Sequence, residues 1–116
     1  MKRQDIFDKV YKHLLNQGAK SLAKNGSCLY KSGGRKCAIG CLIDDKNYDS
    51  TKLEHKGISS TLVQDAVKNS NKGMHLNKIT KDMLASLQAV HDNNDPENWQ
   101  TVLHRLAKRY NLKIPT

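Results

Sequence analysis

The sequence is poor in aromatic residues, in proline and in long apolar runs. Its 116 residues include one Phe, one Trp and two Pro. The longest apolar stretch, residues 38–43, contains Gly40 and is far shorter than the roughly 20 residues that span a bilayer. We therefore expect no membrane-spanning helix. The amino terminus also lacks the apolar core of a secretory signal, so we expect a cytoplasmic protein, in the host bacterium if a phage encodes it.

Cysteine is scarce and its count is odd. Cys28, Cys37 and Cys41 do not form an obvious disulfide framework in a chain without an export signal, so we expect free thiols. Buried, apolar thiols are the favoured interpretation. The alternative is a small zinc site that joins the three thiolates to a histidine such as His55 or His91. Since the close C-x-x-C pairs of common zinc modules are missing, we expect no cofactor, with zinc as the alternative.

Motifs of common enzyme classes are missing as well. The sequence has no glycine-rich phosphate loop, no H-E-x-x-H, no G-x-S-x-G and no calcium loop. A cysteine with His91 as base and Asp92 or Asn93 as orienting group would suit a thiol hydrolase. A histidine on the apolar face of a helix is more often structural, so we predict no catalytic residue. His91, Asp92 and Asn93 also form a candidate ligand loop, although Asp and Asn commonly just end one helix and cap the next.

Positive charge is what the sequence has in excess. It contains 20 Lys and Arg against 11 Asp and Glu, for a formal net charge of +9, which favours an anionic partner. Two clusters are candidate contacts with nucleic acid or with another anionic partner: Lys31, Arg35 and Lys36 beside a predicted turn, and Arg105, Lys108 and Arg109 in the last predicted helix. A solvated surface is the ordinary explanation for each cluster, and no known nucleic-acid-binding signature accompanies either.

Apolar spacing indicates a mainly α (α+β) fold in a single small domain, residues 1–116, because no linker divides the chain. The pattern predicts about four helices, near residues 5–17, 60–68, 80–93 and 96–111, with Asp5 as the cap of the first. A short β-hairpin is expected around the Gly33-Gly34 turn, with arms over 28–31 and 36–39. Residues 40–43 fit either a strand or a short buried helix. Residues 44–57 should form a surface connection with one helical turn near Tyr48.

Three segments of the sequence resemble those of a known family. They are Cys28-Leu29-Tyr30, the run KCAIGCLI over 36–43 and the run LQAVHDN over 87–93. Together, and in this order, they resemble a family of small uncharacterised proteins of tailed bacteriophages and prophages. The resemblance covers nearly the whole chain and implies a phage-encoded accessory protein that acts in an infected cell.

The family has no settled activity, so the resemblance assigns no catalytic residue. Small size, basicity and the missing enzyme motifs favour a non-enzymatic protein. We expect it to bind a host or phage macromolecule, with a protein as the favoured partner, during takeover of the host or evasion of its defence. A basic nucleic-acid-binding module and a small zinc-binding protein are the alternatives.

Overall fold

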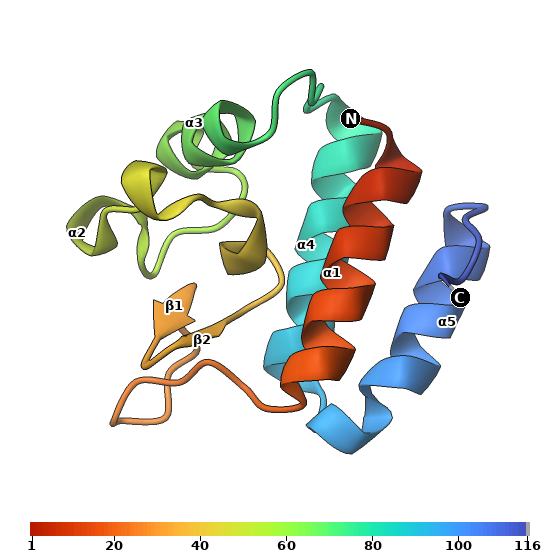
Figure 1. Ribbon diagram of the computed structural model, residues 1–116, viewed down its shortest axis with the longest axis horizontal. Helices are drawn as coiled ribbons and strands as arrows, with labels where there is room; N and C mark the ends of the chain where they lie inside the picture. Colours follow the sequence, from red (N-terminus) through yellow and green to blue (C-terminus); the bar gives the residue numbers. More distant parts are fainter. Residues whose placement is uncertain (116) are drawn as a thin grey trace.

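The computed structural model describes residues 1–115. Three long helices pack against one another: α1 (Arg3–Gln17), α4 (Lys78–Asn93) and α5 (Trp99–Arg109). Helices α1 and α4 run in the same direction, and α5 returns in the opposite one (Figure 1). The hairpin and two shorter helices lie on the other side of α1 and α4 from α5 (Figure 1). The mainly α architecture with one small hairpin is as the sequence predicts.

Capping hydrogen bonds set the boundaries of helices α1 and α4. Helix α1 begins before Asp5, because the Asp5 carboxylate accepts the Lys2 backbone N–H at 2.9 Å from inside the first turn. It ends at Gly18, whose φ of 62° suits glycine. Helix α4 begins ahead of Thr80, since the Asn77 side chain accepts the Thr80 N–H at 2.9 Å. The sequence therefore predicted both helices but placed the start of each too late.

The connection between the hairpin and α4 contains more helix than expected. Helix α3 (Thr61–Ser70) matches its prediction. The helical turn expected near Tyr48 is found just after it, as the one-turn helix α2 (Ser50–Leu53), which makes five α-helices within residues 1–115. Short 3-10 turns span Gly40–Leu42, Asp45–Asn47 and Pro96–Asn98. The first of these turns decides between the two readings of residues 40–43 in favour of a short helix.

The hairpin is smaller than predicted. Strands β1 (Lys31–Ser32) and β2 (Arg35–Lys36) pair antiparallel around the glycine turn. The predicted arms are cut short because Cys28 pairs with Leu22 in an isolated bridge instead. The second arm ends at Lys36 because a turn begins at Ala38. In this turn Gly40 comes so close to Tyr30 that a Cβ atom would lie 2.0 Å from the Tyr30 carbonyl oxygen. Only glycine fits this close approach.

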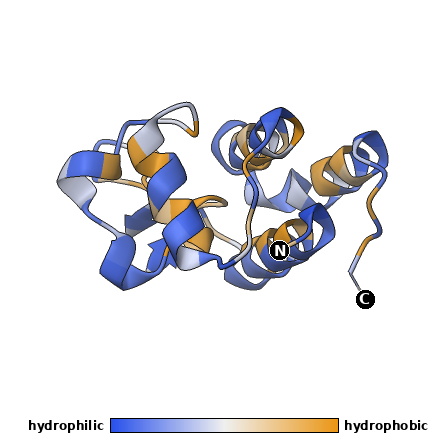
Figure 2. Cartoon of the chain, turned by 90° about the horizontal axis from the view of Figure 1, so that it is seen from above, coloured by the Kyte–Doolittle hydropathy of each residue, from blue (hydrophilic) through white to orange (hydrophobic). Residues whose placement is uncertain are grey.

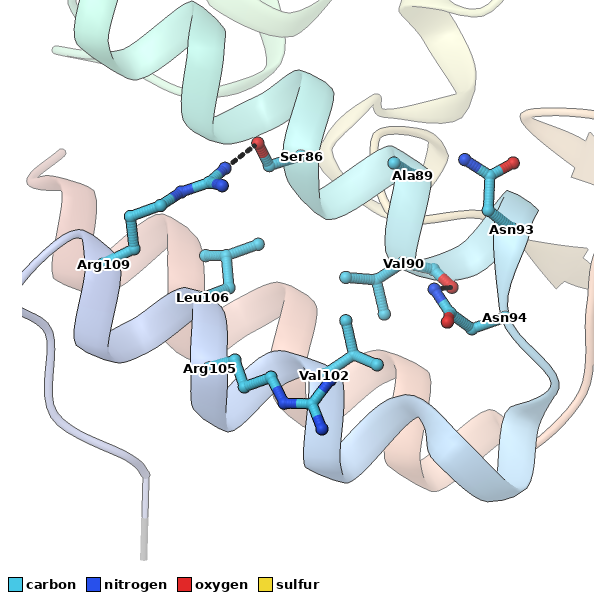
Figure 3. Close-up of a pocket in the computed structure, with 9 residues that line it drawn as sticks. All are labelled: Ser86, Ala89, Val90, Asn93, Asn94, Val102, Arg105, Leu106 and Arg109. Atoms are coloured by element: carbon cyan, nitrogen blue, oxygen red, sulfur yellow. Dashed lines mark hydrogen bonds between the residues drawn. The ribbon is translucent and has the colours of Figure 1, made fainter.

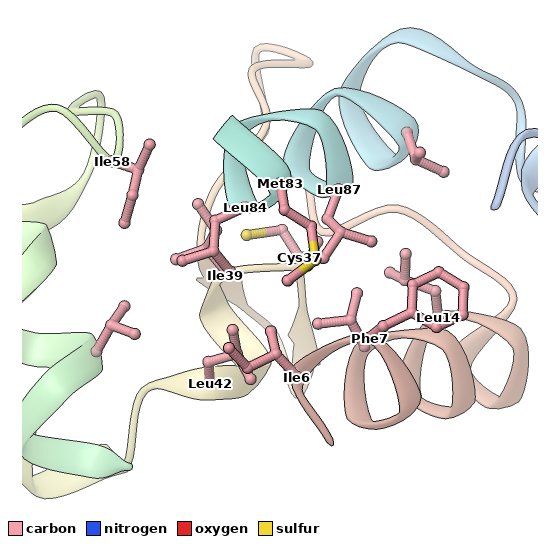
Figure 4. Packing of buried hydrophobic residues seen from close by; sticks show 14 of the residues in the cluster. Ile6, Phe7, Leu14, Cys37, Ile39, Leu42, Ile58, Met83, Leu84 and Leu87 are labelled. Atoms are coloured by element: carbon pink, nitrogen blue, oxygen red, sulfur yellow. The ribbon is translucent and has the colours of Figure 1, made fainter. Parts of the chain in front are cut away.

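The core fills the space between the helices and the hairpin. Apolar residues lie on the sides of the helices that face the interior (Figure 2), and Figure 4 shows them meeting around Cys37. Trp99 and Phe7 are its largest fully buried side chains. Val102 and Tyr110 were predicted to be buried with Trp99 but are half-buried, because they lie at the edge of the apolar stripe of α5.

Within residues 1–115, no helix has both the length and the apolar character that crossing a bilayer requires.

Candidate functional site

Residues of the three family-like segments converge at the carboxyl end of α4. The Gln88 side chain accepts the Ile39 backbone N–H at 3.0 Å and donates to Asp92 Oδ1 at 2.8 Å. It therefore fastens the KCAIGCLI run to the helix that carries the LQAVHDN run. We call Ser21, Cys28, Gln88, His91 and Asp92 the Cys28 cluster.

His91 is the buried centre of the Cys28 cluster. Its ring is fully buried and stacks on Trp99, with 5.5 Å between the ring centroids. The Ser21 backbone N–H donates to His91 Nε2 at 3.0 Å, so Nε2 is an acceptor and carries no proton. The imidazole proton of the neutral ring must then lie on Nδ1, which donates to Asp92 Oδ1 at 2.7 Å.

Cys28 completes the cluster from the loop before the hairpin. Its sulfur, the Asp92 carboxylate and the His91 imidazole supply ligand-type atoms that all lie within 4.8 Å of one another. Partial burial, and then the charge and hydrogen bond of Asp92, raise the pKa of the Cys28 thiol. Desolvation opposes ionisation of Asp92, but hydrogen bonds from His91, Gln88 and Cys28 outweigh it and lower the pKa of that carboxyl group. At neutral pH the cluster therefore holds a protonated thiol beside a carboxylate.

This order of groups differs from the one that a thiol hydrolase needs. In such an enzyme the imidazole stands between the thiol and the carboxylate and takes the thiol proton. Here Asp92 stands between Cys28 and His91, and the acceptor nitrogen of His91 faces the Ser21 amide. Asn93 does not join the cluster and is exposed on the other side of α4. The residues of the catalytic hypothesis thus meet in part, without the geometry that activates a thiol.

The cysteines do not gather as a zinc site would require. Cys37 Sγ accepts the Gly40 N–H at 3.3 Å, and Cys41 Sγ donates to the Ala38 carbonyl at 3.0 Å. Burial raises the pKa of both thiols, that of Cys41 to about 12. Neither thiol belongs to the group of metal-ligand atoms around Cys28.

The three groups that could hold a metal ion in residues 1–115 are Cys28, His91 and Asp92. A neutral imidazole has one free lone pair, and on His91 it accepts the Ser21 N–H. To bind a metal ion, His91 would therefore have to lose the hydrogen bond from the Ser21 N–H or give up the Nδ1 proton that it donates to Asp92. His55, the other histidine considered for a zinc site, lies at the rim of a pocket of about 220 Å³ beside Cys28, in a left-handed conformation with φ 66°.

The two carboxylates that line this pocket already accept hydrogen bonds. Glu54 accepts the backbone N–H groups of Tyr30, at 2.8 Å, and Lys31, at 3.3 Å, and also the Tyr48 hydroxyl. Asp92 accepts from Gln88, His91 and Cys28. The polar groups around Cys28 thus hold the hairpin, the α2 segment and α4 together.

The predicted basic residues separate into two groups on different sides of the molecule (Figure 1). In the hairpin, Lys31 donates to the Ile43 carbonyl at 2.6 Å and to Asp45 at 2.7 Å, and its side chain is only 11% exposed. Lys36 is half-buried and Arg35 is exposed. Of the three predicted cations of the hairpin, only Arg35 is therefore exposed.

The cations of α5 are more accessible. Arg105, Lys108 and Arg109 are all exposed, and two of them line a groove between α4 and α5 of about 360 Å³ (Figure 3). We call this the α4–α5 groove. Arg109 Nη2 donates across it to Ser86 Oγ at 2.9 Å, while its guanidinium lies over the Tyr110 ring. A second hollow, of about 340 Å³, shares Arg105 and also contains Lys108.

Sequence reasoning missed the apolar lining of the α4–α5 groove. Ala89, Val90, Val102 and Leu106 line it, with Asn93 at the end near the turn between the helices. Val102 was assigned to the core because its spacing matches the buried stripe of α5. Val102 lies one helical turn before Arg105 and two helical turns before Arg109, on the same face of α5. This spacing is the signal that could have placed Val102 at the exposed edge of the apolar stripe.

Comparison with protein-family models, with curated proteins and with solved structures finds no significant match to this chain.

Proposed function

We propose that this chain is an accessory protein of the tailed-bacteriophage kind that acts by binding an acidic host or phage protein and catalyses no reaction itself. The observation that carries the proposal is the basic face of α5, formed by Arg105, Lys108 and Arg109. Within residues 1–115, the side chains of Arg105 and Lys108 make no hydrogen bond or ion pair. These cations are therefore available to steer and hold an anionic partner.

The chemistry of the Cys28 cluster supports a role without catalysis. The thiol of Cys28 has a raised pKa, and no imidazole nitrogen is free to take its proton. A nucleophilic cysteine needs the opposite, namely a lowered thiol pKa or a base beside it.

The lining of the two hollows favours a protein partner over nucleic acid. Neither hollow is lined by Phe, Tyr or Trp, on which exposed bases usually stack. The α4–α5 groove is instead lined by methyl groups, which are better suited to an apolar side chain than to a phosphate backbone.

The proposal is tested by affinity capture from bacterial lysate with nuclease present. We compare the wild-type chain with Arg105→Glu/Lys108→Glu on α5 and with Lys24→Glu/Lys46→Glu, which makes the same charge change at exposed positions elsewhere. We expect one dominant acidic protein that the α5 variant loses and the control variant keeps. Recovery of DNA or RNA that nuclease abolishes would replace the proposal by nucleic-acid binding. Equal loss with both variants would show that net charge alone is responsible.

A further inference from the structure

We infer that the α4–α5 groove is the docking site for an acidic amphipathic helix of the partner protein, with an apolar side chain of that helix in the groove. Its carboxylates would lie against Arg105 and Arg109. This inference rests on the proposed function and specifies which surface of the partner is recognised.

The groove combines an apolar floor with a cationic rim. Val90, Val102 and Leu106 line it from the two helices; Val90 and Leu106 are nearly buried, whereas Val102 and Ala89 are partly exposed. Arg105 lies on the α5 side, and Arg109 crosses one end of the groove to Ser86 (Figure 3). No Asp or Glu is among the residues that line it. An occupant must therefore cover methyl surface and neutralise two guanidinium groups, which an apolar residue flanked by Glu or Asp does.

The side chains of the two arginines differ in how far they are held in place before a partner binds. Arg109 is held by Ser86 Oγ and by the Tyr110 ring, so less side-chain freedom is lost when it binds a carboxylate. Arg105 has no partner within residues 1–115 and lies between the groove and the second hollow. The side chain of Arg105 can therefore reach a carboxylate on either side of the bound helix. Arginine is also the cation most enriched at the centres of protein interfaces.

The arrangement of the helices explains why the occupant should be a helix. Helices α1, α4 and α5 pack pairwise, and α1 lies behind the α4–α5 pair in the view of Figure 3. The groove therefore opens on the face away from α1. A further helix laid there would complete a four-helix arrangement by helix-in-groove docking. The volume of about 360 Å³ suits one or two anchoring side chains, and the rest of the interface would spread over α5.

The test is a selection of displayed helical peptides of about 15 residues, roughly four turns, against the wild-type chain. Binding of the enriched peptides is then measured by fluorescence anisotropy at about 150 mM salt, where the Debye length is about 8 Å. We expect enriched peptides to carry an apolar residue with Glu or Asp one turn to either side. Enrichment of neutral or basic peptides, or no enrichment, would overturn the inference.

Two variants locate the site. Ala89→Phe fills the groove without a change in charge, and Arg105→Glu/Arg109→Glu reverses its rim. Each should weaken peptide binding at least tenfold, with the circular dichroism spectrum and thermal midpoint unchanged. The control Lys24→Glu/Lys46→Glu should change the affinity for the peptide less than twofold at this salt concentration. Equal binding by wild type and Ala89→Phe would show that the helix binds elsewhere.

The lysate capture separates this inference from the proposed function. If Ala89→Phe still captures the acidic protein that Arg105→Glu/Lys108→Glu loses, the basic face functions and the groove does not. If the wild-type chain captures no protein and enriches no peptide, both ideas fail.

Discussion

The Cys28 cluster and the α4–α5 groove both lie on α4, yet they differ in whether their polar groups already have partners. In the cluster, the acceptors of Asp92 and His91 are occupied by donors from the same chain. In the groove, Arg105 has no partner within residues 1–115, and the apolar residues Ala89 and Val102 are partly exposed. A group of chemically reactive residue types can therefore be structural, while ordinary valines and arginines form the surface that we propose as a docking site.

The comparison predicts that the largest loss of stability comes from His91→Ala. The substitution removes a fully buried ring from its stack on Trp99 and leaves the Ser21 N–H without its acceptor. We expect a loss of about 3 kcal/mol in the free energy of unfolding, measured by urea denaturation. His75→Ala, at an exposed histidine, is the control and should change it by less than about 0.5 kcal/mol. A stable His91→Ala variant would mean that the cluster is not a structural centre.

A smaller loss is expected for Asp92→Asn, because the amide keeps the shape of the side chain but not its charge. About 1–2 kcal/mol should be lost near pH 7. The lowered pKa of Asp92 means that its ionised form stabilises the fold above the ordinary pKa of 3.8. That contribution is lost as the pH falls through the lowered pKa. Thermal melts should therefore show the wild type and the variant converging below about pH 4, and a constant difference would contradict this role.

Cys28→Ser should cost less still. A serine hydroxyl can replace the thiol as a donor to Asp92, so the change in unfolding free energy should be below about 1 kcal/mol. The raised thiol pKa also predicts slow reaction of Cys28 with a disulfide reagent near pH 8, and slower reaction of the more buried Cys37 and Cys41. Quenched labelling followed by mass spectrometry measures the three rates. Fast labelling of Cys28 in the folded chain would reopen the case for a reactive thiol.

The smallest effect on stability is expected in the groove. Arg105→Glu/Arg109→Glu removes one exposed hydrogen bond to Ser86 and the contact of Arg109 with the Tyr110 ring, and it places an acid in the last turn of α5. Because all of these groups are at least partly exposed to solvent, the unfolding free energy should change by only about 0.5 kcal/mol. The same variant should lose binding to an acidic helix. A large loss of stability would show that these arginines support the fold. The groove would then be structural in the same way as the Cys28 cluster.

Local patterns predicted the helices well, because apolar spacing and caps are properties of neighbouring residues. Helices α3 and α4 were visible in this way. The start expected at Pro96 is instead a 3-10 turn over Pro96–Asn98, and α5 follows it from Trp99 to Arg109, shorter than the predicted 96–111. The sequence did not predict that Cys28 would leave the hairpin to pair with Leu22, since two alternative partners compete for one strand edge. That choice depends on tertiary contacts, which no local pattern contains.

The two candidate regions were predictable to different degrees. Residue types alone suggested that a cysteine, His91 and Asp92 might meet, but not the order in which they hydrogen-bond, which depends on the Ser21 amide. The basic residues named on α5 are exposed, whereas Lys31, another candidate contact with an anionic partner, is paired within the chain. Charge counts cannot reveal that a nearby carbonyl and Asp45 already bind its ammonium group.

The stack of Trp99 on His91 has a practical consequence. Trp99 is the only tryptophan in the sequence, its ring is fully buried, and its indole N–H donates to the Asn94 carbonyl at 3.1 Å. The chain thus carries an intrinsic optical reporter at the corner between α4 and α5. Its emission should shift to longer wavelength when that corner opens, without any attached dye. A helix docking from outside should leave the emission maximum unchanged, so one spectrum distinguishes an occupied surface from a loosened fold.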